Sequence, residues 1–302
     1  MSSEFPKVAV LLAAYNGMEW IEQQLVSICA QDYVSVSVYI SVDPSVDGTE
    51  AWCAEFARTN RNVHLLPQAG PYSGAARNFF RLIRDVDLSG YDYVSFADQD
   101  DIWYLDKLRR AVDTLHSGSY EGYSSNVIAF WSNGHRMLVD KAQPQVEWDY
   151  LFEAAGPGCT YVLKTELATA FKSLIVSEWE KVQEVALHDW FCYAFARSQG
   201  LRWFIDPVPG MDYRQHASNQ VGVNSGFVSA ITRLNRIMDG WWFTQIRLIA
   251  SLLKITKPSI VKDCEVNRFW TVVKFTLAIS KCRRRVRDRL ALLVVCLFRG
   301  GK

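Results

Sequence analysis

Apolar and polar positions along residues 1–115 follow two alternating spacings. Val8–Ala14 is an unbroken apolar run, which is typical of a buried parallel strand. Residues 34–42 alternate between apolar and polar side chains, which predicts a second strand. Between and after these runs, as from Met18 to Cys29, apolar residues recur at helical spacing. The repeated order of strand and helix predicts an α/β fold with a doubly wound, mostly parallel sheet flanked by helices.

The middle of the chain carries weaker signals of the same kind. Three short runs predict further strands: 127–131, 159–163 and 201–205. Residues 187–197 predict a helix that ends before Gly200. Residues 206–226 are rich in Gly, Pro, Asn and His, so we expect a loop there. Beyond this loop the spacing is helical, with an interruption at Pro258.

Charge divides the chain near the end of that loop. The net charge of the 302 residues is +1, but residues 231–302 carry 16 Lys and Arg against 4 Asp and Glu. Residues 1–230 carry 17 Lys and Arg against 28 Asp and Glu. We therefore expect a catalytic α/β domain over 1–226 and a helical, basic extension over 227–302. A basic extension of this kind indicates an anionic surface as its partner.

Composition narrows the class of protein. With 49% apolar and 13% aromatic residues, the chain can bury a sizeable core and is not expected to be disordered. None of the seven cysteines forms a Cys-x-x-Cys pair, which argues against a disulfide framework or zinc finger and for a reducing cytosol. Residues 1–7 lead directly into the first strand, so no signal peptide is expected.

The strongest chemical signal is Asp98-Gln99-Asp100-Asp101, which follows a strand predicted over 91–97. Three carboxylates within four residues repel one another unless a cation lies among them. Such hard oxygen ligands suit Mg²⁺ or Mn²⁺. The same carboxylates could instead stabilise the start of the next helix. In a doubly wound sheet, ligands bind at the carboxyl ends of the strands, where this cluster lies.

Three weaker signals accompany the acidic cluster. Asp43 leaves the second strand and could accept from a base imide or a ribose hydroxyl, or form a turn. Asp189 lies at a predicted helix start beside Trp190, where burial would raise its pKa and suit a general base, although a helix cap is the alternative. Arg214 and His216 could hold a diphosphate or complete a metal site, or be solvated in their loop.

In order and spacing, these motifs resemble the family 2 glycosyltransferases of the GT-A fold, over about residues 6–225. The rhamnosyltransferase-like members that build bacterial surface polysaccharides are the most similar group. The residues that carry the resemblance are Ala13-Ala14-Tyr15-Asn16-Gly17, Asp43 to Thr49, Asp98-Gln99-Asp100-Asp101-Ile102-Trp103, His188-Asp189-Trp190 and Tyr213-Arg214-Gln215-His216. One departure is Val42, because the family often has two adjacent aspartates at this point.

The resemblance implies a role for each matched carboxylate. Asp43 would contact the nucleobase and Asp98 the ribose. Asp100 would bind the metal ion, Mg²⁺ or Mn²⁺, that bridges the two phosphates and neutralises the leaving nucleoside diphosphate. Asp189 would deprotonate the acceptor hydroxyl, and attack from the face opposite the diphosphate would invert the anomeric carbon. His216 would add a metal or phosphate contact.

Five further residues are implied to hold the nucleotide-sugar donor. Tyr15 and Asn16 lie at the end of the first strand, Arg77 and Asn78 lie in a stretch that faces the nucleotide in the family, and Arg214 would contact a phosphate. The resemblance favours dTDP-rhamnose as donor, with a UDP-hexose second. The implied acceptor is a hydroxyl of a lipid-linked glycan, and no nucleic-acid partner is expected.

The basic extension suggests where the enzyme works. Residues 282–289 carry five arginines and precede an apolar stretch over 290–298. That stretch would span only about 13 Å as a helix, whereas a bilayer core is about 30 Å thick. We therefore expect peripheral binding at the cytoplasmic face of the inner membrane. A helical cap on the catalytic domain, or a homodimer formed through these helices, is the alternative.

Three other functions compete with a glycosyltransferase. A phosphatase or phosphotransferase with an aspartate nucleophile also carries Asp-x-Asp after a strand, but usually after its first strand. A dinucleotide oxidoreductase would need Gly-x-Gly-x-x-Gly after the first strand, and the sequence has none. A non-catalytic, membrane-bound scaffold that retains the glycosyltransferase shape stays open as the third alternative.

Overall fold

The computed structural model describes residues 5–216, 240–256 and 276–299. The chain separates into two compact units, which we describe separately: residues 1–142 with 155–222, and residues 143–154 with 223–302. The domain boundary expected at residues 226–227 lies outside the described residues, as does Pro258.

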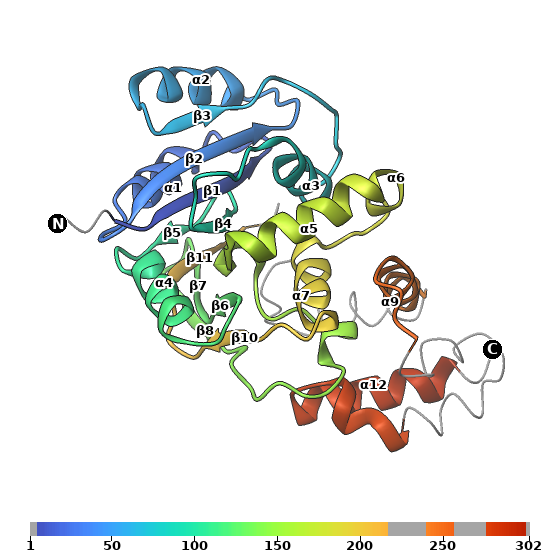
Figure 1. Ribbon diagram of the computed structural model, residues 1–302. Coiled ribbons are helices and arrows are strands. Elements are labelled where there is room, and N and C mark those ends of the chain that lie inside the picture. The colour runs from blue at the N-terminus through green and yellow to red at the C-terminus, as the bar shows by residue number, and fades with distance from the viewer. Residues whose placement is uncertain (1–4, 217–239, 257–275, 300–302) are drawn as a thin grey trace. The chain divides into compact units, whose positions relative to one another are not determined.

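The larger unit is built on a seven-stranded sheet with strand order β10-β6-β9-β4-β1-β2-β3 (Figure 1). Its strands are β1 (Lys7–Ala14), β2 (Ser35–Val42), β3 (Val63–Leu65), β4 (Tyr93–Ala97), β6 (Gly122–Ser125), β9 (Val162–Lys164) and β10 (Trp203–Asp206). All neighbouring pairs are parallel except those of β9, which runs antiparallel to β4 and β6. The expected α/β fold with a mostly parallel sheet is confirmed.

Hydrophobic burial explains why these strands form where the sequence predicted them. β1 is buried at every position after Lys7, because β2 and β4 pair with it on either side. The flanking helices are α1 (Ile21–Cys29), α2 (Thr49–Thr59), α3 (Ala75–Asp85), α4 (Lys107–Ser117), α5 (Thr165–Ser177), α6 (Trp179–Val182) and α7 (His188–Ser198). Helix α3 contacts β1, α5 and α7, so packed helices cover the sheet at β1 (Figure 1).

A second, smaller sheet was not predicted. It has the order β5-β11-β7-β8, from β5 (Ile102–Trp103), β7 (Val127–Trp131), β8 (Arg136–Val139) and β11 (Met211–Gln215). The loop expected over 206–226 was therefore wrong at β11. This polar strand forms because its backbone pairs with β7 on one side and β5 on the other. Backbone pairing leaves no pattern of apolar residues in the sequence, so the spacing of apolar residues could not predict it. The pairing carries Arg214 to the loop that follows β4.

The smaller unit is helical in its described part, as expected. It contains the 3₁₀ turn η1 (Asp149–Leu151), α9 (Trp241–Leu252), a helical stretch over 276–282, and α12 (Val286–Arg299). Within the described residues, no helix is both long enough and apolar enough to cross a membrane.

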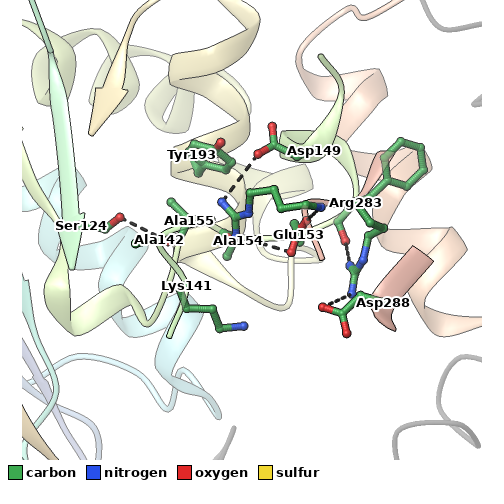
Figure 2. Close-up of polar contacts among 12 residues, drawn as sticks. Ser124, Lys141, Ala142, Asp149, Glu153, Ala154, Ala155, Tyr193, Arg283 and Asp288 are labelled. Atoms are coloured by element: carbon green, nitrogen blue, oxygen red, sulfur yellow. Dashed lines mark hydrogen bonds and ion pairs between the residues drawn. The ribbon is translucent and has the colours of Figure 1, made fainter. Parts of the chain in front are cut away.

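One arginine joins the two stretches of chain that make up this unit. The Arg284 side chain is fully buried, and its guanidinium lies 3.6 Å from Asp149 and 3.5 Å from Glu153. Figure 2 labels these two carboxylates and marks the ion pairs with dashed lines. Arg284 also donates a 2.6 Å hydrogen bond to the Ala154 carbonyl, and Arg283 donates to the Phe152 carbonyl. Two carboxylates and a carbonyl thus compensate the desolvation of one buried cation. One arginine of the basic segment 282–289 is therefore paired inside the protein and does not face solvent.

Candidate active site

The predicted site residues come from the carboxyl ends of β1, β2 and β4, from the start of α3 and α7, and from the end of β11. Strands β4, β1 and β2 are neighbours in the seven-stranded sheet, whereas β11 belongs to the smaller sheet (Figure 1). In an open parallel sheet this edge is where ligands bind. The residues fall into a loop group around β1 and β2, a carboxylate group after β4, and the first turn of α7.

Asn16 and Tyr15 form the turn that leaves β1. Asn16 has a φ of +43°, a left-handed conformation that asparagine tolerates better than most residues. Its backbone N–H donates to the Ser45 hydroxyl, and its side-chain oxygen accepts from the N–H of Val46. The Tyr15 side chain is 57% exposed. Asn16 therefore ties the turn after β1 to the turn after β2, while the Tyr15 ring remains available to a ligand.

Asp43 lies buried at the end of β2. One carboxylate oxygen accepts from the N–H of Tyr72 at 2.7 Å and the other from the N–H of Ser73 at 3.0 Å. These bonds draw the segment before α3 against the end of the sheet. Gly70 has a φ of +113°, and a Cβ added there would lie 2.9 Å from the Asp43 carboxylate. A carboxylate has about four acceptor positions, so these two bonds leave acceptor capacity for a nucleobase.

Arg77 and Asn78 lie in the first turn of α3, with different surroundings. Arg77 is exposed and donates to the Gln183 carbonyl at 2.8 Å. Asn78 is buried, and its amide donates to the carbonyls of Ser41 and Ala14 while accepting from the Ser41 hydroxyl. Asn78 thus joins the ends of β1 and β2 from beneath. The predicted contacts of both residues with a nucleotide stay predictions.

The carboxylates after β4 are crowded and partly withdrawn from water. Burial, with the nearby charges of Asp100 and Asp189, raises the pKa of Asp98 to about 7. Asp101 is fully buried, and burial and the charges of Asp100 and Asp98 raise its pKa well above the usual range. One Asp101 oxygen accepts from the backbone N–H of Arg214; within the described part of the chain, the other has no hydrogen-bond partner. Such a cluster favours a bound cation.

Two residues that the sequence analysis missed lie beside this cluster. Ligand atoms of Cys159, Asp98 and Asp101 all lie within 4.8 Å of one another. Cys159 belongs to the 3₁₀ turn η2 (Gly158–Thr160). Lys107 is buried over the Trp103 ring, and burial lowers its pKa to about 7. Lys107 shares a helical face with the buried Leu108 and Ala111, and that spacing would have flagged it.

Arg214 and His216 both approach Asp100. Arg214 donates from Nε to the Asp100 carbonyl at 2.8 Å and from its terminal nitrogen to the Gln23 side chain. The Nε2 atom of His216 lies 2.8 Å from a carboxylate oxygen of Asp100. The structure therefore brings the two predicted metal ligands together. It places Arg214 where it orients the backbone of this loop.

Carboxylate and imidazole donors at one point fit the predicted Mg²⁺ or Mn²⁺. Asp100 and His216 supply the adjacent pair, and Asp98 adds a half-buried carboxylate from the same loop. Carboxylate oxygen is the preferred ligand of both ions, and Mn²⁺ also accepts imidazole well. The buried Asp101 carboxyl, with one oxygen that has no hydrogen-bond partner among the described residues, is a further oxygen donor of this cluster.

Asp189 opens α7, as its place in the sequence predicted. Its carboxylate accepts from the N–H of Trp190 at 2.7 Å. Burial raises the pKa of Asp189 to about 6, although backbone N–H groups and the charge of Lys141 oppose the shift. Its charge in turn raises the pKa of Asp98, so the two carboxylates lie close enough to interact electrostatically. A carboxylate with this pKa can accept a proton from an alcohol near neutral pH.

His188 supports Asp189 from below. Its ring stacks on Phe79 with centroids 3.8 Å apart and meets the edge of Phe96. Burial lowers the pKa of His188 to about 3, so this imidazole is neutral at physiological pH. The His188 ring fills space under the first turn of α7, and a Cβ on Gly158 would lie 2.7 Å from its Nε2. Gly158 is therefore needed for close packing at this point.

Comparison with known sequences finds one family and several relatives. The family model described as "Glycosyltransferase like family 2" matches residues 6–206. The dTDP-rhamnosyl transferase RfbG of Shigella flexneri is 43% identical over 288 residues, which cover 95% of this chain and 99% of that protein. The amylovoran biosynthesis glycosyltransferase AmsB of Erwinia amylovora is 35% identical over 179 residues, covering 54% of this chain and 57% of that protein.

Solved structures share the fold at low sequence identity. Residues 1–349 of S. aureus TarS superpose with a TM-score of 0.55 at 13% identity, covering 98% of this chain and 92% of that one. The mannosyltransferase PcManGT of Pyrobaculum calidifontis, solved with GDP-Man and Mn²⁺, gives 0.53 at 15% identity, covering 99% and 88%. The predicted GT-A type of architecture is confirmed by these likenesses.

Proposed function

The chain belongs to glycosyltransferase family 2 and is a glycosyltransferase, and from this we propose that it moves rhamnose from dTDP-rhamnose to an acceptor hydroxyl with inversion. The observation that carries the proposal is Asp189, whose pKa is about 6 beside the carboxylates that follow β4. The name of the Shigella relative supports the choice of donor. A UDP-hexose is the second candidate.

The donor would lie across the ends of β1, β2 and β4. Asp43 accepts from the nucleobase with its remaining acceptor positions, and Asp98 accepts from a ribose hydroxyl. The exposed Tyr15 ring and the turn at Asn16 border the same place. Arg77, which is exposed, and its buried neighbour Asn78 are also assigned to donor binding.

The diphosphate end of the donor requires a positive charge. Asp100 and His216 would hold Mg²⁺ or Mn²⁺, which when bound supplies Lewis-acid stabilisation of the leaving diphosphate. Arg214 holds the Asp100 backbone in place through the 2.8 Å bond to its carbonyl. The Mn²⁺ in the solved mannosyltransferase supports the assignment of a divalent ion.

Asp189 acts on the acceptor. Its carboxylate takes the proton of the acceptor hydroxyl as that oxygen attacks the anomeric carbon. The bond from the anomeric carbon to the phosphate oxygen breaks on the opposite face, and the nucleoside diphosphate leaves with the electron pair. One displacement of this kind inverts the anomeric configuration. The raised pKa of Asp189 improves proton acceptance without protonating it fully at pH 7.

The acceptor is proposed to be a lipid-linked glycan reached at the cytoplasmic face of the inner membrane. Three residues spaced four apart on α12 form an apolar row: Val286, Leu290 and Val294 are 66%, 61% and 44% exposed. The Arg287 side chain, beside this row, is 79% exposed. An apolar row beside basic residues suits the surface of an anionic leaflet. A homodimer seam is the alternative for this row.

The direct test is a transfer assay with the full chain. The protein is incubated with Mn²⁺, a synthetic diphospholipid-linked glycan, and dTDP-rhamnose, UDP-glucose or UDP-GlcNAc in separate reactions, and products are read by mass spectrometry and by NMR of the new anomeric centre. We expect rhamnose transfer with inverted configuration. Donor hydrolysis without transfer to any hydroxyl, or a retained configuration, would contradict the proposal.

A further inference from the structure

The imidazole of His216 has an aromatic partner that the transferase mechanism does not use. The ring of Trp20 stacks on it with centroids 4.0 Å apart and planes inclined by 24°. Trp20 is the last residue before α1, whereas His216 follows β11. The two rings therefore join parts of the chain that are far apart in sequence.

We infer that Trp20 is a positioning residue for the divalent-ion site. It holds the imidazole plane of His216 so that Nε2 faces the Asp100 carboxylate, and it couples that site to the donor-binding turn at Tyr15 and Asn16. The inference rests on the proposed metal-assisted transfer and extends it to a residue that touches neither metal nor donor.

The stack matters because His216 lies just past the end of a strand. The last torsion of a histidine side chain has a broad, soft energy profile, so the ring can turn unless a neighbour restrains it. Trp20 stacks on one face of this ring with the centroids 4.0 Å apart, and such stacking of aromatic rings is favourable. Restraint of this torsion keeps Nε2 at 2.8 Å from the Asp100 oxygen.

A second contact ties the other end of the same turn to the carboxylates. The Gln99 side chain accepts from the Tyr15 N–H at 2.7 Å and donates to the Tyr15 carbonyl at 2.9 Å. Gln99 lies between Asp98 and Asp100. The turn is thus held to the carboxylate loop at Tyr15 and, through His216, at Trp20. Movement of the turn on donor binding would shift both contacts, so we expect ion binding and donor binding to be coupled.

The side chain of Trp20 can be changed without removing the helix start. Its backbone N–H donates to the Gly17 carbonyl at 2.9 Å, and its carbonyl accepts from the Gln24 N–H at 3.2 Å. Both bonds are made by the main chain and persist in any substitution except proline. Trp20→Leu removes the aromatic stack, and Trp20→Phe keeps a ring.

Mn²⁺ binding without donor tests the inference directly. Free Mn²⁺ is measured by its electron paramagnetic resonance signal during titration of full-length wild type, Trp20→Leu, Trp20→Phe and His216→Ala. Residues that orient metal ligands typically contribute about 10- to 100-fold in affinity. We expect Trp20→Leu to weaken Mn²⁺ binding at least tenfold and Trp20→Phe to restore most of the loss. Trp179→Leu is the matched control, since Trp179 is a half-buried tryptophan at the start of α6 that packs against Arg84.

The double variant Trp20→Leu/His216→Ala separates positioning from general structural damage. If Trp20 acts through His216, the double variant binds Mn²⁺ no more weakly than His216→Ala alone. Equal Mn²⁺ affinity of wild type and Trp20→Leu, or additive losses in the double variant, would overturn the inference and leave the proposed function standing. Absence of Mn²⁺ binding by wild type would overturn both the metal assignment and this inference.

Discussion

Asp189 and Asp98 are both carboxylates whose pKa is raised mainly by burial, yet they have different neighbours. At Asp189, backbone N–H groups partly offset the rise in pKa, which reaches about 6. At Asp98, the charges of Asp100 and Asp189 add to the effect of burial, and the pKa reaches about 7. A cation at Asp100 would remove part of the repulsion on Asp98. Asp189 is thus suited to accept a proton, whereas Asp98 would become charged when the ion is bound.

Replacing Asp189 with Asn tests the general base. The substitution keeps the size of the side chain and its contact with Trp190, but the amide cannot accept the acceptor proton. We expect transfer to fall by about 10²- to 10⁴-fold, with donor affinity within about twofold of wild type. Initial rates at saturating donor and calorimetry with dTDP measure the two quantities. Near wild-type turnover would remove Asp189 from this role.

The pH dependence of transfer follows from the same carboxylate. Its pKa is raised to about 6, so the proton-accepting form is lost as the pH falls below that value. We expect kcat to rise about tenfold for each pH unit below the pKa and to level off above it. The profile is measured at saturating donor and acceptor, with thermal unfolding at each pH as control. A rate that is flat between pH 5 and pH 8 would not fit.

Asp100→Ala tests the metal assignment, and we expect the fold around residue 100 to be retained. We expect Mn²⁺-dependent binding of dTDP to be lost, because one of two adjacent ligands is removed and His216 alone holds the ion poorly. Calorimetry with and without Mn²⁺ measures this, and circular dichroism checks the fold. Glu180→Ala, at an exposed position on α6, serves as control. Unchanged affinity in Asp100→Ala would contradict the assignment.

At the level of elements, the sequence predicted what burial determines. β1, β2, β4 and their helices follow apolar periodicity, and Asp43, Asp98 and Asp189 were found because they directly follow a strand or open a helix. β11 was missed because backbone pairing with β5 and β7, rather than an apolar face, makes it a strand. Cys159 and Trp20 were missed for a related reason, since their neighbours come from distant parts of the chain.

The segment 143–154 is another element that local sequence does not signal. It joins the smaller unit through the buried Arg284, which is held by Asp149 and Glu153. Arg284→Ala would leave these two carboxylates without their cation in a buried place. Breaking a buried pair in this way typically costs about 3–5 kcal/mol.

We therefore expect Arg284→Ala to lower the unfolding midpoint of the smaller unit markedly, while Arg287→Ala changes it little because that side chain is 79% exposed. Urea unfolding followed by limited proteolysis, with cleavage sites mapped by mass spectrometry, distinguishes the two units. Equal protection of 143–154 in both variants would show that Arg284 does not hold this segment.

On the scale of the whole molecule, charge separates a net acidic catalytic part from a basic C-terminal part. Residues 231–302 carry 16 basic and 4 acidic residues. The structure removes Arg284 from the charges that can meet a surface, since its side chain is fully buried. Among the described side chains of α12, the row formed by Val286, Leu290 and Val294 is exposed, and so is Arg287. A lipid surface would therefore be bound by apolar insertion and charge together.

Membrane binding is best tested by a point change, because deletion of the C-terminal part would uncover the partners of Arg284 in 143–154. We expect full-length protein to float with vesicles containing phosphatidylglycerol and poorly with phosphatidylcholine alone. Leu290→Glu should reduce flotation roughly tenfold or more, since a buried leucine contributes about 1.5–3 kcal/mol and the new charge is repelled.

Leu138→Glu is the control, because Leu138 is 50% exposed on β8 in the other unit. Equal flotation of both variants would exclude the α12 row as the anchor. A dimer that Leu290→Glu separates, without any preference for anionic lipid, would make the row a subunit interface instead.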